Sequence, residues 1–270
     1  MQKRFTPLKP VVIRPEDCTP DLKRRIVAGL PFFAGLGADA IDSVMPYFRE
    51  TGADAGSRII CEADVSAGAA DSDDIEQRAA GSAALENERR AGSEDKPALY
   101  VVAAGLVKLS RVDYEGRTVV LDFLVTGETF GPLAGAAPGD TASAHTDGCV
   151  FAVTTADMNR LFAAYPSAAT RLLEQTAARV AALHERLHLL SVGSVRDRIV
   201  AALRSLSEKA GEPRGEDMLL QIPLTREDLA SMAGTTPESA SREISRLDRE
   251  GYIAAGRRWI SLRPDFFALD

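Results

Sequence analysis

The sequence predicts an α+β fold in which an N-terminal roll of short strands precedes one long helix and a C-terminal winged helix-turn-helix. Three observations predict it. Between about residues 56 and 154 the chain consists mainly of short β-type runs separated by glycine. From Pro166 to about Val192 apolar residues recur at heptad spacing. Beyond residue 224, two short helical patterns meet at Gly234.

Length and composition are those of a globular protein of two moderate domains. The chain has 270 residues, 45% of them hydrophobic, and a formal net charge of -7. The acidity argues against a non-specific nucleic-acid coat protein but leaves room for a local DNA-binding surface. The N-terminus has no apolar core of signal-peptide length, and the longest apolar run, LYVVAAGLV, is too short to span a bilayer. We therefore expect a cytoplasmic protein without membrane contact.

Composition divides the chain into four parts. Residues 1–23 are Pro-rich and are expected to be flexible, and residues 24–165 carry the roll. Within the roll, residues 64–96 are rich in Ala, Gly, Ser and acids, which predicts a disordered insertion because such a composition buries too little apolar surface. A partner or phosphorylation site stays open there. Residues 166–193 form a dimerisation helix and hinge, and residues 194–270 form the winged helix-turn-helix.

The roll begins with a helix that has apolar residues from Leu36 to Phe48 and Asp39 near its start. The β-type runs GSRIICE, ALYVVAAGLVKLSRVD, RTVVLDFLVTGETFG and GCVFAVTT follow it. Gly116 marks a hairpin turn between two of them. Many short strands at this spacing favour a jelly roll over a βαβ sheet.

The long helix carries an apolar seam with alternating steps of three and four residues. This is the pattern of a two-stranded helix pair and predicts a dimer interface; packing of the helix on its own domain is the alternative. The seam residues are Leu173, Thr176, Val180, Leu183, Leu187 and Leu190.

After Gly193, SVRDRIVAALRSLSEKAG predicts an amphipathic helix that ends at Gly211. GEPRGED is expected to be a loop and MLLQIPL a short strand. Thr225 is a natural N-cap for the next helix, with Asp228 three positions on.

The last helix begins with Thr236 as cap and Pro237 as first residue, where the missing N–H costs nothing. Its buried face is predicted to be Ala240, Ile244 and Leu247. YIAAGRRWISL then predicts a β-hairpin wing with Gly256 at its tip.

One face of this helix presents Glu238, Ser241 and Arg242, which are spaced i, i+3 and i+4. In the major groove a guanidinium can bond both acceptors of guanine, and a carboxylate can accept from the cytosine amino group. These three residues are the candidates for base reading. A surface ion pair between Glu238 and Arg242 is the alternative reading.

The motifs LTREDLA, GTTPESASREISRL and REGYI resemble the C-terminal domain of the Crp–Fnr family of bacterial transcription regulators. The resemblance extends from about Ile26 to Leu262, apart from the insertion. It implies a cyclic-nucleotide-binding-like sensor roll, a dimer helix and a DNA-binding domain. It also implies a homodimer on an inverted-repeat site in double-stranded DNA, with RNA polymerase as a further partner.

The segment Glu-x-x-Ser-Arg resembles the Fnr-type reading set. The Crp branch has an arginine where this chain has Pro237, so the resemblance favours TTGAT-type half-sites. Residues near the helix starts and on the wing are expected to hold backbone phosphates: Thr225, Arg226, Thr236, Ser239, Arg257 and Arg258.

The family's cyclic-nucleotide pocket uses a Gly-Glu-Leu segment and an Arg-Ser/Thr segment. Here Pro132 of GPLAG replaces the glutamate, and Thr141 or Ala142 replaces the arginine. Burial of a phosphate without its cation is costly, which argues against cyclic AMP. An Fnr-type iron–sulfur cluster needs four cysteines, and the N-terminal region has only Cys18.

Haem is a further possibility, because His184 could ligate the iron and make the protein a sensor of NO or CO. His184 and His188 as exposed or hydrogen-bonded helix residues are the alternative, and a regulator without any ligand also stays open. The candidates for an effector pocket are Gly131, Pro132, Leu133, Ser143 and His184.

The three cysteines, Cys18, Cys61 and Cys149, are widely spaced and predict buried or incidental thiols without zinc. The sequence has no G-x-x-x-x-G-K-S/T, H-E-x-x-H or G-x-S-x-G motif, so we do not expect an enzyme. An interaction adaptor that has lost DNA binding is the rival from another class.

Overall fold

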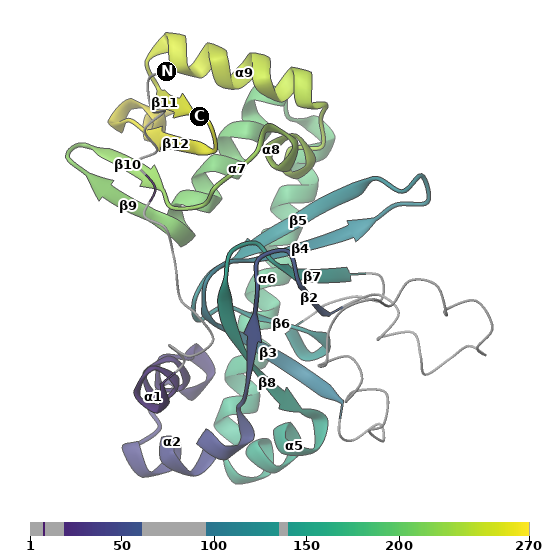
Figure 1. Cartoon of the computed structure of the whole chain (residues 1–270), viewed down its shortest axis with the longest axis vertical. Coiled ribbons are helices and arrows are strands. Elements are labelled where there is room, and N and C mark those ends of the chain that lie inside the picture. The colour runs from purple at the N-terminus through teal and green to yellow at the C-terminus, as the bar shows by residue number, and fades with distance from the viewer. Residues whose placement is uncertain (1–7, 9–18, 61–95, 135–139, 270) are drawn as a thin grey trace. The chain divides into compact units, whose positions relative to one another are not determined.

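Figure 1 shows the computed structural model, which describes residues 8, 19–60, 96–134 and 140–269. The segment predicted to be disordered, apart from Lys96, lies outside these residues, as do Cys18 and Cys61. The chain forms two compact units. Among the described residues, the roll unit contains 19–60, 96–107, 126–134 and 140–178, and the winged-helix unit contains 8, 108–125 and 179–269.

The first helix begins at Pro20, three residues before the end of the segment that the sequence predicts to be flexible. Thr19 is its N-cap and accepts a hydrogen bond from the Leu22 N–H at 3.3 Å. A threonine followed by proline at the first helical position favours a helix start, so the predicted flexible segment is too long at its C-terminal end.

The helical segments of the roll unit pack their aromatic residues into its core. Phe32, Phe33 and Phe48 are each at most 1% exposed and lie together with apolar residues of strands β3 (Pro97–Ala104) and β8 (Gly148–Thr154). The segments are α1 (Pro20–Ala28), η2 (Pro31–Phe33), α2 (Ala38–Val44), η3 (Met45–Tyr47), η5 (Pro132–Ala134), α5 (Thr155–Ala164) and the beginning of α6 (Pro166–Val192).

Within the described residues, the strands before α6 form two four-stranded sheets with the orders β1-β8-β3-β6 and β2-β7-β4-β5. In the first sheet, β8 pairs antiparallel with both β1 and β3. Non-consecutive neighbours of this kind confirm the jelly-roll prediction over a βαβ sheet. The strands are β1 (Arg49–Ala53), β2 (Arg58–Ile60), β3 (Pro97–Ala104), β4 (Val107–Val112), β5 (Thr118–Leu124), β6 (Thr129–Phe130), β7 (Asp140–Ala144) and β8 (Gly148–Thr154).

Cys149 on β8 is buried and disulfide-bonded. The expectation of a free thiol is therefore wrong at this position. Disulfide pairing is decided by which strands the fold brings together, and the spacing of three cysteines along the sequence does not show that.

Beyond the end of α6, the described part of the winged-helix unit combines three helices with a sheet of order β11-β12-β10-β9 (Figure 1). The elements are α7 (Val195–Ala210), β9 (Gly211–Arg214), β10 (Asp217–Leu220), α8 (Arg226–Met232), α9 (Pro237–Glu250), β11 (Ile253–Gly256), β12 (Trp259–Leu262) and η6 (Pro264–Ala268). The bounds of α6 and α7 confirm both helix predictions. The wing is confirmed as the antiparallel pair β11–β12.

The loop predicted over GEPRGED is wrong in its first half. Residues Gly211–Arg214 form strand β9, which pairs antiparallel with β10 and turns at Gly215 with φ 63°. Because β9 is the edge strand of this sheet, Pro213 does not break an internal ladder. The glycines and the proline of this segment are typical of loops, and here they belong to a β-hairpin.

Strand β5 docks on the helices of the winged-helix unit through polar contacts. The Val120 N–H donates to the Ser231 hydroxyl of α8 at 2.5 Å, and Lys209 Nζ of α7 lies 2.7 Å from an Asp122 carboxylate oxygen. Arg186 of α6 donates to the carbonyls of Leu121 and Met232. Burial lowers the pKa of this guanidinium, and Asp122 opposes the shift. Side chains of α6, α7 and α8 thus all make polar contacts with β5.

Candidate DNA-binding surface

Helix α8 begins with the predicted cap. The Asp228 N–H donates to the Thr225 hydroxyl at 3.0 Å, and the Thr225 N–H donates to the Asp228 carboxylate at 3.0 Å. This reciprocal capping box satisfies two backbone donors that the helix itself leaves unpaired. It fixes the first turn of α8.

Helix α9 is also capped at both ends. Thr236 accepts from the Ser239 N–H at 3.2 Å, Pro237 is the first helical residue, and Gly251 ends the helix in the left-handed conformation with φ 86°. Ala240, Ile244 and Leu247 are fully buried, as predicted. The remaining faces of α9 are therefore available for polar contacts.

The three candidate base-reading residues lie on α9, with Glu238 and Arg242 exposed and Ser241 half-buried. Arg242 Nη2 donates to the Ser239 hydroxyl at 3.3 Å. Hydrogen bonds from the Glu238 N–H and the Thr236 hydroxyl hold the pKa of Glu238 below 4.5, and the charge of Arg242 lowers it further. An anionic acceptor and a cationic donor are thus presented side by side.

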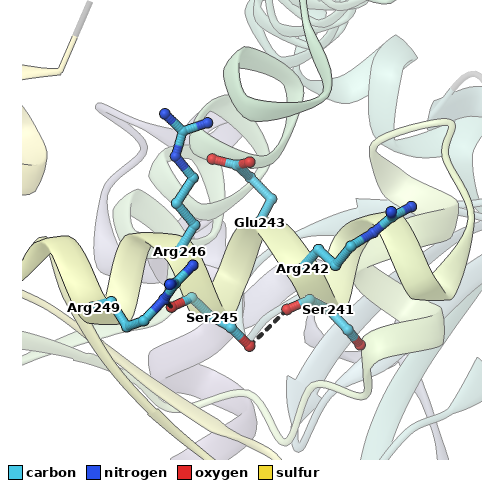
Figure 2. A pocket seen from close by; sticks show the side chains of 6 residues that line it. All are labelled: Ser241, Arg242, Glu243, Ser245, Arg246 and Arg249. Atoms are coloured by element: carbon cyan, nitrogen blue, oxygen red, sulfur yellow. Dashed lines mark hydrogen bonds between the residues drawn. The ribbon is translucent and has the colours of Figure 1, made fainter.

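A shallow, open groove of about 440 Å³ lies along the same helix, and Figure 2 shows the side chains that line it. The groove extends beyond the predicted residues to the next turns of α9, where Ser245 and Arg249 lie at i+4 and i+7 from Ser241 and Arg242. Neither residue is among the base-reading candidates predicted from the sequence, in which Arg249 is assigned to a solvated face, although helical spacing places both on this side. The lining residues are Ser241, Arg242, Glu243, Ser245, Arg246 and Arg249.

A second hollow, of about 220 Å³, brings four of the six phosphate candidates together. Thr225 and Arg226 come from the start of α8, and Arg257 and Arg258 come from the wing. Arg226 is half-buried, and burial lowers the pKa of its guanidinium while Asp248 opposes that shift. The two other candidates, Thr236 and Ser239, lie at the start of α9. The hollow therefore has the donors and the positive charge that a phosphate needs.

The seam of α6 is largely uncovered in the single chain. Leu173, Val180, Leu183 and Leu187 are 70%, 45%, 53% and 61% exposed. Leu190 differs, because one of its methyl groups packs against the turn at Gly234. Exposed leucines at heptad spacing are typical of a helix that pairs with another helix.

The effector-pocket candidates fall in both units. In the roll unit, Gly131 is buried with φ 106°, Pro132 and Leu133 are exposed, and Ser143 is half-buried on β7. His184 belongs to the winged-helix unit and is exposed on α6.

Within the described ranges, no three His, Cys, Asp or Glu side chains are grouped so that they could hold a metal ion. The helices of the same ranges include none with the length and hydropathy to cross a membrane.

The architecture and the exposed face of α9 define a winged helix-turn-helix DNA-binding protein. Residues 197–265 match the model of the Crp-like helix-turn-helix domain, and residues 89–165 match that of the cyclic nucleotide-binding domain. The transcriptional regulator SdrP of Thermus thermophilus is 31% identical over 169 residues, which cover 60% of this chain and 78% of SdrP. The chain belongs to the Crp/Fnr family of transcription regulators.

The chain is also similar to other proteins. The cyclic AMP receptor protein of Thermus thermophilus is 27% identical over 87% of this chain and 93% of its own. The structure of FixK2 from Bradyrhizobium japonicum superposes with a TM-score of 0.62 at 21% identity, covering 83% of this chain and 97% of FixK2. The structure of a CooA mutant from Carboxydothermus hydrogenoformans superposes with a TM-score of 0.61 at 15% identity, covering 84% of this chain and 88% of the CooA chain. Both structures share the fold.

Proposed function

We propose that the protein is a homodimeric transcription regulator that reads an inverted repeat of TTGAT-type half-sites. The observation that carries this proposal is the exposed face of α9, on which Glu238, Ser241 and Arg242 follow the Fnr-type spacing. Two-fold symmetry of the dimer would place the two copies of α9 in successive major grooves, about one helical turn of DNA apart.

Each residue has a chemical role in this proposal. The Arg242 guanidinium donates to both major-groove acceptors of a guanine, and the Glu238 carboxylate accepts from a cytosine amino group. The low pKa of Glu238 keeps its carboxylate ionised at neutral pH. Thr225, Arg226, Arg257 and Arg258, which share one hollow, and Thr236 and Ser239 at the start of α9 would contact backbone phosphates and fix the register.

The effector is proposed to differ from cyclic AMP. Pro132 is exposed and brings no carboxylate to the position where the family has one, and Thr141 and Ala142 on β7 bring no guanidinium. A cyclic nucleotide would therefore lack both its ribose acceptor and its phosphate cation. Calorimetric titration with cyclic AMP and cyclic GMP tests this, and low-micromolar affinity for either would refute it.

Substitution of Arg242 tests base reading. We expect Arg242→Ala to lower the ratio of affinities for cognate and scrambled duplexes by roughly 5- to 150-fold per half-site, which is the contribution of one bidentate base contact. Arg160→Ala, which removes an arginine of the roll unit, is the matched control. Equal discrimination by Arg242→Ala and the parent, with the dimer intact, would reject the role of Arg242.

A further inference from the structure

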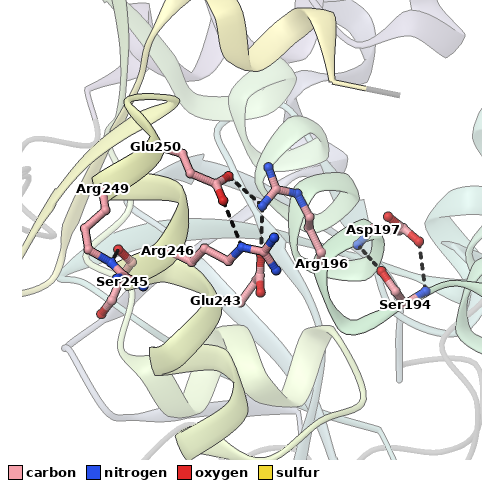
Figure 3. Close-up of polar contacts among 8 residues, drawn as sticks. All are labelled: Ser194, Arg196, Asp197, Glu243, Ser245, Arg246, Arg249 and Glu250. Carbon is pink, nitrogen blue, oxygen red and sulfur yellow. Dashed lines mark hydrogen bonds and ion pairs between the residues drawn. The ribbon is translucent and has the colours of Figure 1, made fainter.

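Arg196 of α7 contacts α9 at two places. Its Nη1 atom lies 3.1 Å from Glu243 Oε1 and 2.8 Å from Glu250 Oε2. Figure 3 shows this guanidinium between the two carboxylates. Because Glu243 and Glu250 are seven residues apart, they lie two turns apart on the same flank of α9. One side chain therefore joins the middle of the helix to its C-terminal end.

The same guanidinium also contacts the residue that follows the end of α9. It lies over the ring of Tyr252, with its central carbon 5.5 Å from the ring centroid, a distance at which a cation is attracted to an aromatic face. Tyr252 comes directly after Gly251, the left-handed C-cap. Arg196 is only 23% exposed, so its contacts are partly shielded from solvent screening.

The position of Arg196 in α7 is itself fixed. Ser194 and Asp197 form a capping box, with distances of 2.8 Å and 3.2 Å between the backbone nitrogens and side-chain oxygens. Only Gly193 and Ser194 separate α7 from α6. The contact to α9 thus begins in the first turn after the hinge, where a change in the hinge angle would move it.

The network does not include Glu238, Ser241 or Arg242, although Glu243 also lines the groove beside Ser241 and Arg242. Ala240, Ile244 and Leu247 anchor the buried face of α9, and Glu243 and Glu250 belong to the flank that faces α7. Glu250 also accepts from Arg246 Nε at 2.8 Å, which directs Arg246 along its own helix. The core fixes the depth of α9, and the flank contact restrains its rotation about its axis.

We propose that Arg196 is a positioning residue that sets the rotation of α9 and, with it, the direction in which Arg242 meets the bases. This inference rests on the proposed function and adds a residue that does not itself contact DNA. A tilt of α9 displaces the donors of Arg242 from a guanine but leaves contacts to phosphates, which tolerate more variation.

The test compares affinities of the full-length protein for cognate and scrambled duplexes. We expect Arg196→Gln to lower their ratio about tenfold, within the roughly 5- to 150-fold range of a bidentate base contact. A purely electrostatic role would weaken both affinities equally and leave the ratio unchanged. Arg160→Gln, which removes an arginine paired with Asp157 in the roll unit, is the charge-matched control and should keep the parental ratio.

Further variants separate positioning from folding. Glu243→Gln should lower the ratio in the parent but add little in Arg196→Gln, because the two residues act through one contact. Arg196→Lys, which keeps the charge but not the planar fork, should give an intermediate ratio. If Arg196→Gln fails to fold, Glu243→Gln and Glu250→Gln each remove one anchor and take its place.

The inference would be overturned if every variant that folds had the same ratio of affinities for cognate and scrambled duplexes as the parent. A parent that binds DNA without distinguishing the cognate duplex would instead refute the proposed function, so the two failures have different signatures.

Discussion

The apolar seam of α6 gives a quantitative prediction for the dimer. Leu187→Ala removes three carbon atoms, each of which contributes about 0.8 kcal/mol when buried. With 61% of Leu187 exposed in the single chain and available to a partner, the loss is about 1.5 kcal/mol per chain. A homodimer contains two copies, so we expect about 3 kcal/mol, or a dissociation constant raised about 100-fold.

Sedimentation velocity across a dilution series measures that constant directly. The matched control is Val192→Ala, because Val192 lies on the same helix, is 70% exposed and does not belong to the seam. We expect the control to change the constant less than about threefold, in line with other exposed positions. The variant at Leu187 should also bind a single half-site as the parent does, since α9 is unchanged.

Two outcomes would refute the hypothesis that the seam of α6 forms the dimer interface. If Leu187→Ala and Val192→Ala weaken the dimer equally, the association does not depend on heptad position. If neither changes it while the parent is dimeric, another surface forms the interface.

Three further predictions concern the winged-helix unit. Ile244→Ala removes fully buried carbon atoms from α9 and should lower the free energy of unfolding by about 2–5 kcal/mol in urea titration; a loss below about 1 kcal/mol would mean that α9 is not packed on this face. Lys209→Met should increase hydrogen exchange at the β5 amides next to Asp122, because it removes the 2.7 Å contact to that carboxylate; unchanged protection would show that β5 is held by its other contacts. Hydrogen bonds lower the pKa of Glu238 below its ordinary value, so any contribution of its charge to the discrimination between cognate and scrambled duplexes persists at neutral pH and is lost only as pH falls through the lowered pKa; discrimination that declines already near about pH 6 would assign the titration to another group.

The features that the sequence predicted are local ones. Thr225 with Asp228, and Thr236 with Pro237, are start signals that lie within four residues of the bonds they make. The burial of Ile244 on α9 follows from helical periodicity in the same way. Such patterns depend on residues that are close in the sequence, so they can be predicted before the fold is known.

The features that the sequence missed depend on distant contacts. Arg196 and Glu243 are separated by 47 positions, and Val120 and Ser231 by 111. No spacing rule joins residues so far apart, because their approach is a consequence of tertiary packing. The disulfide at Cys149 belongs to the same class.

Different faces of α9 make different kinds of contact. The buried face must remain apolar to hold the helix, and both ends are occupied by Thr236 and Gly251 as caps. The flank toward α7 carries carboxylates that are used by Arg196. The proposed base-reading residue Arg242 lies on the face that remains, next to Glu243, which lines the same groove. A substitution that alters DNA specificity without touching this face would act through the buried face, through an end of the helix or through the flank that contacts Arg196, and only two residues separate the helix of Arg196 from α6.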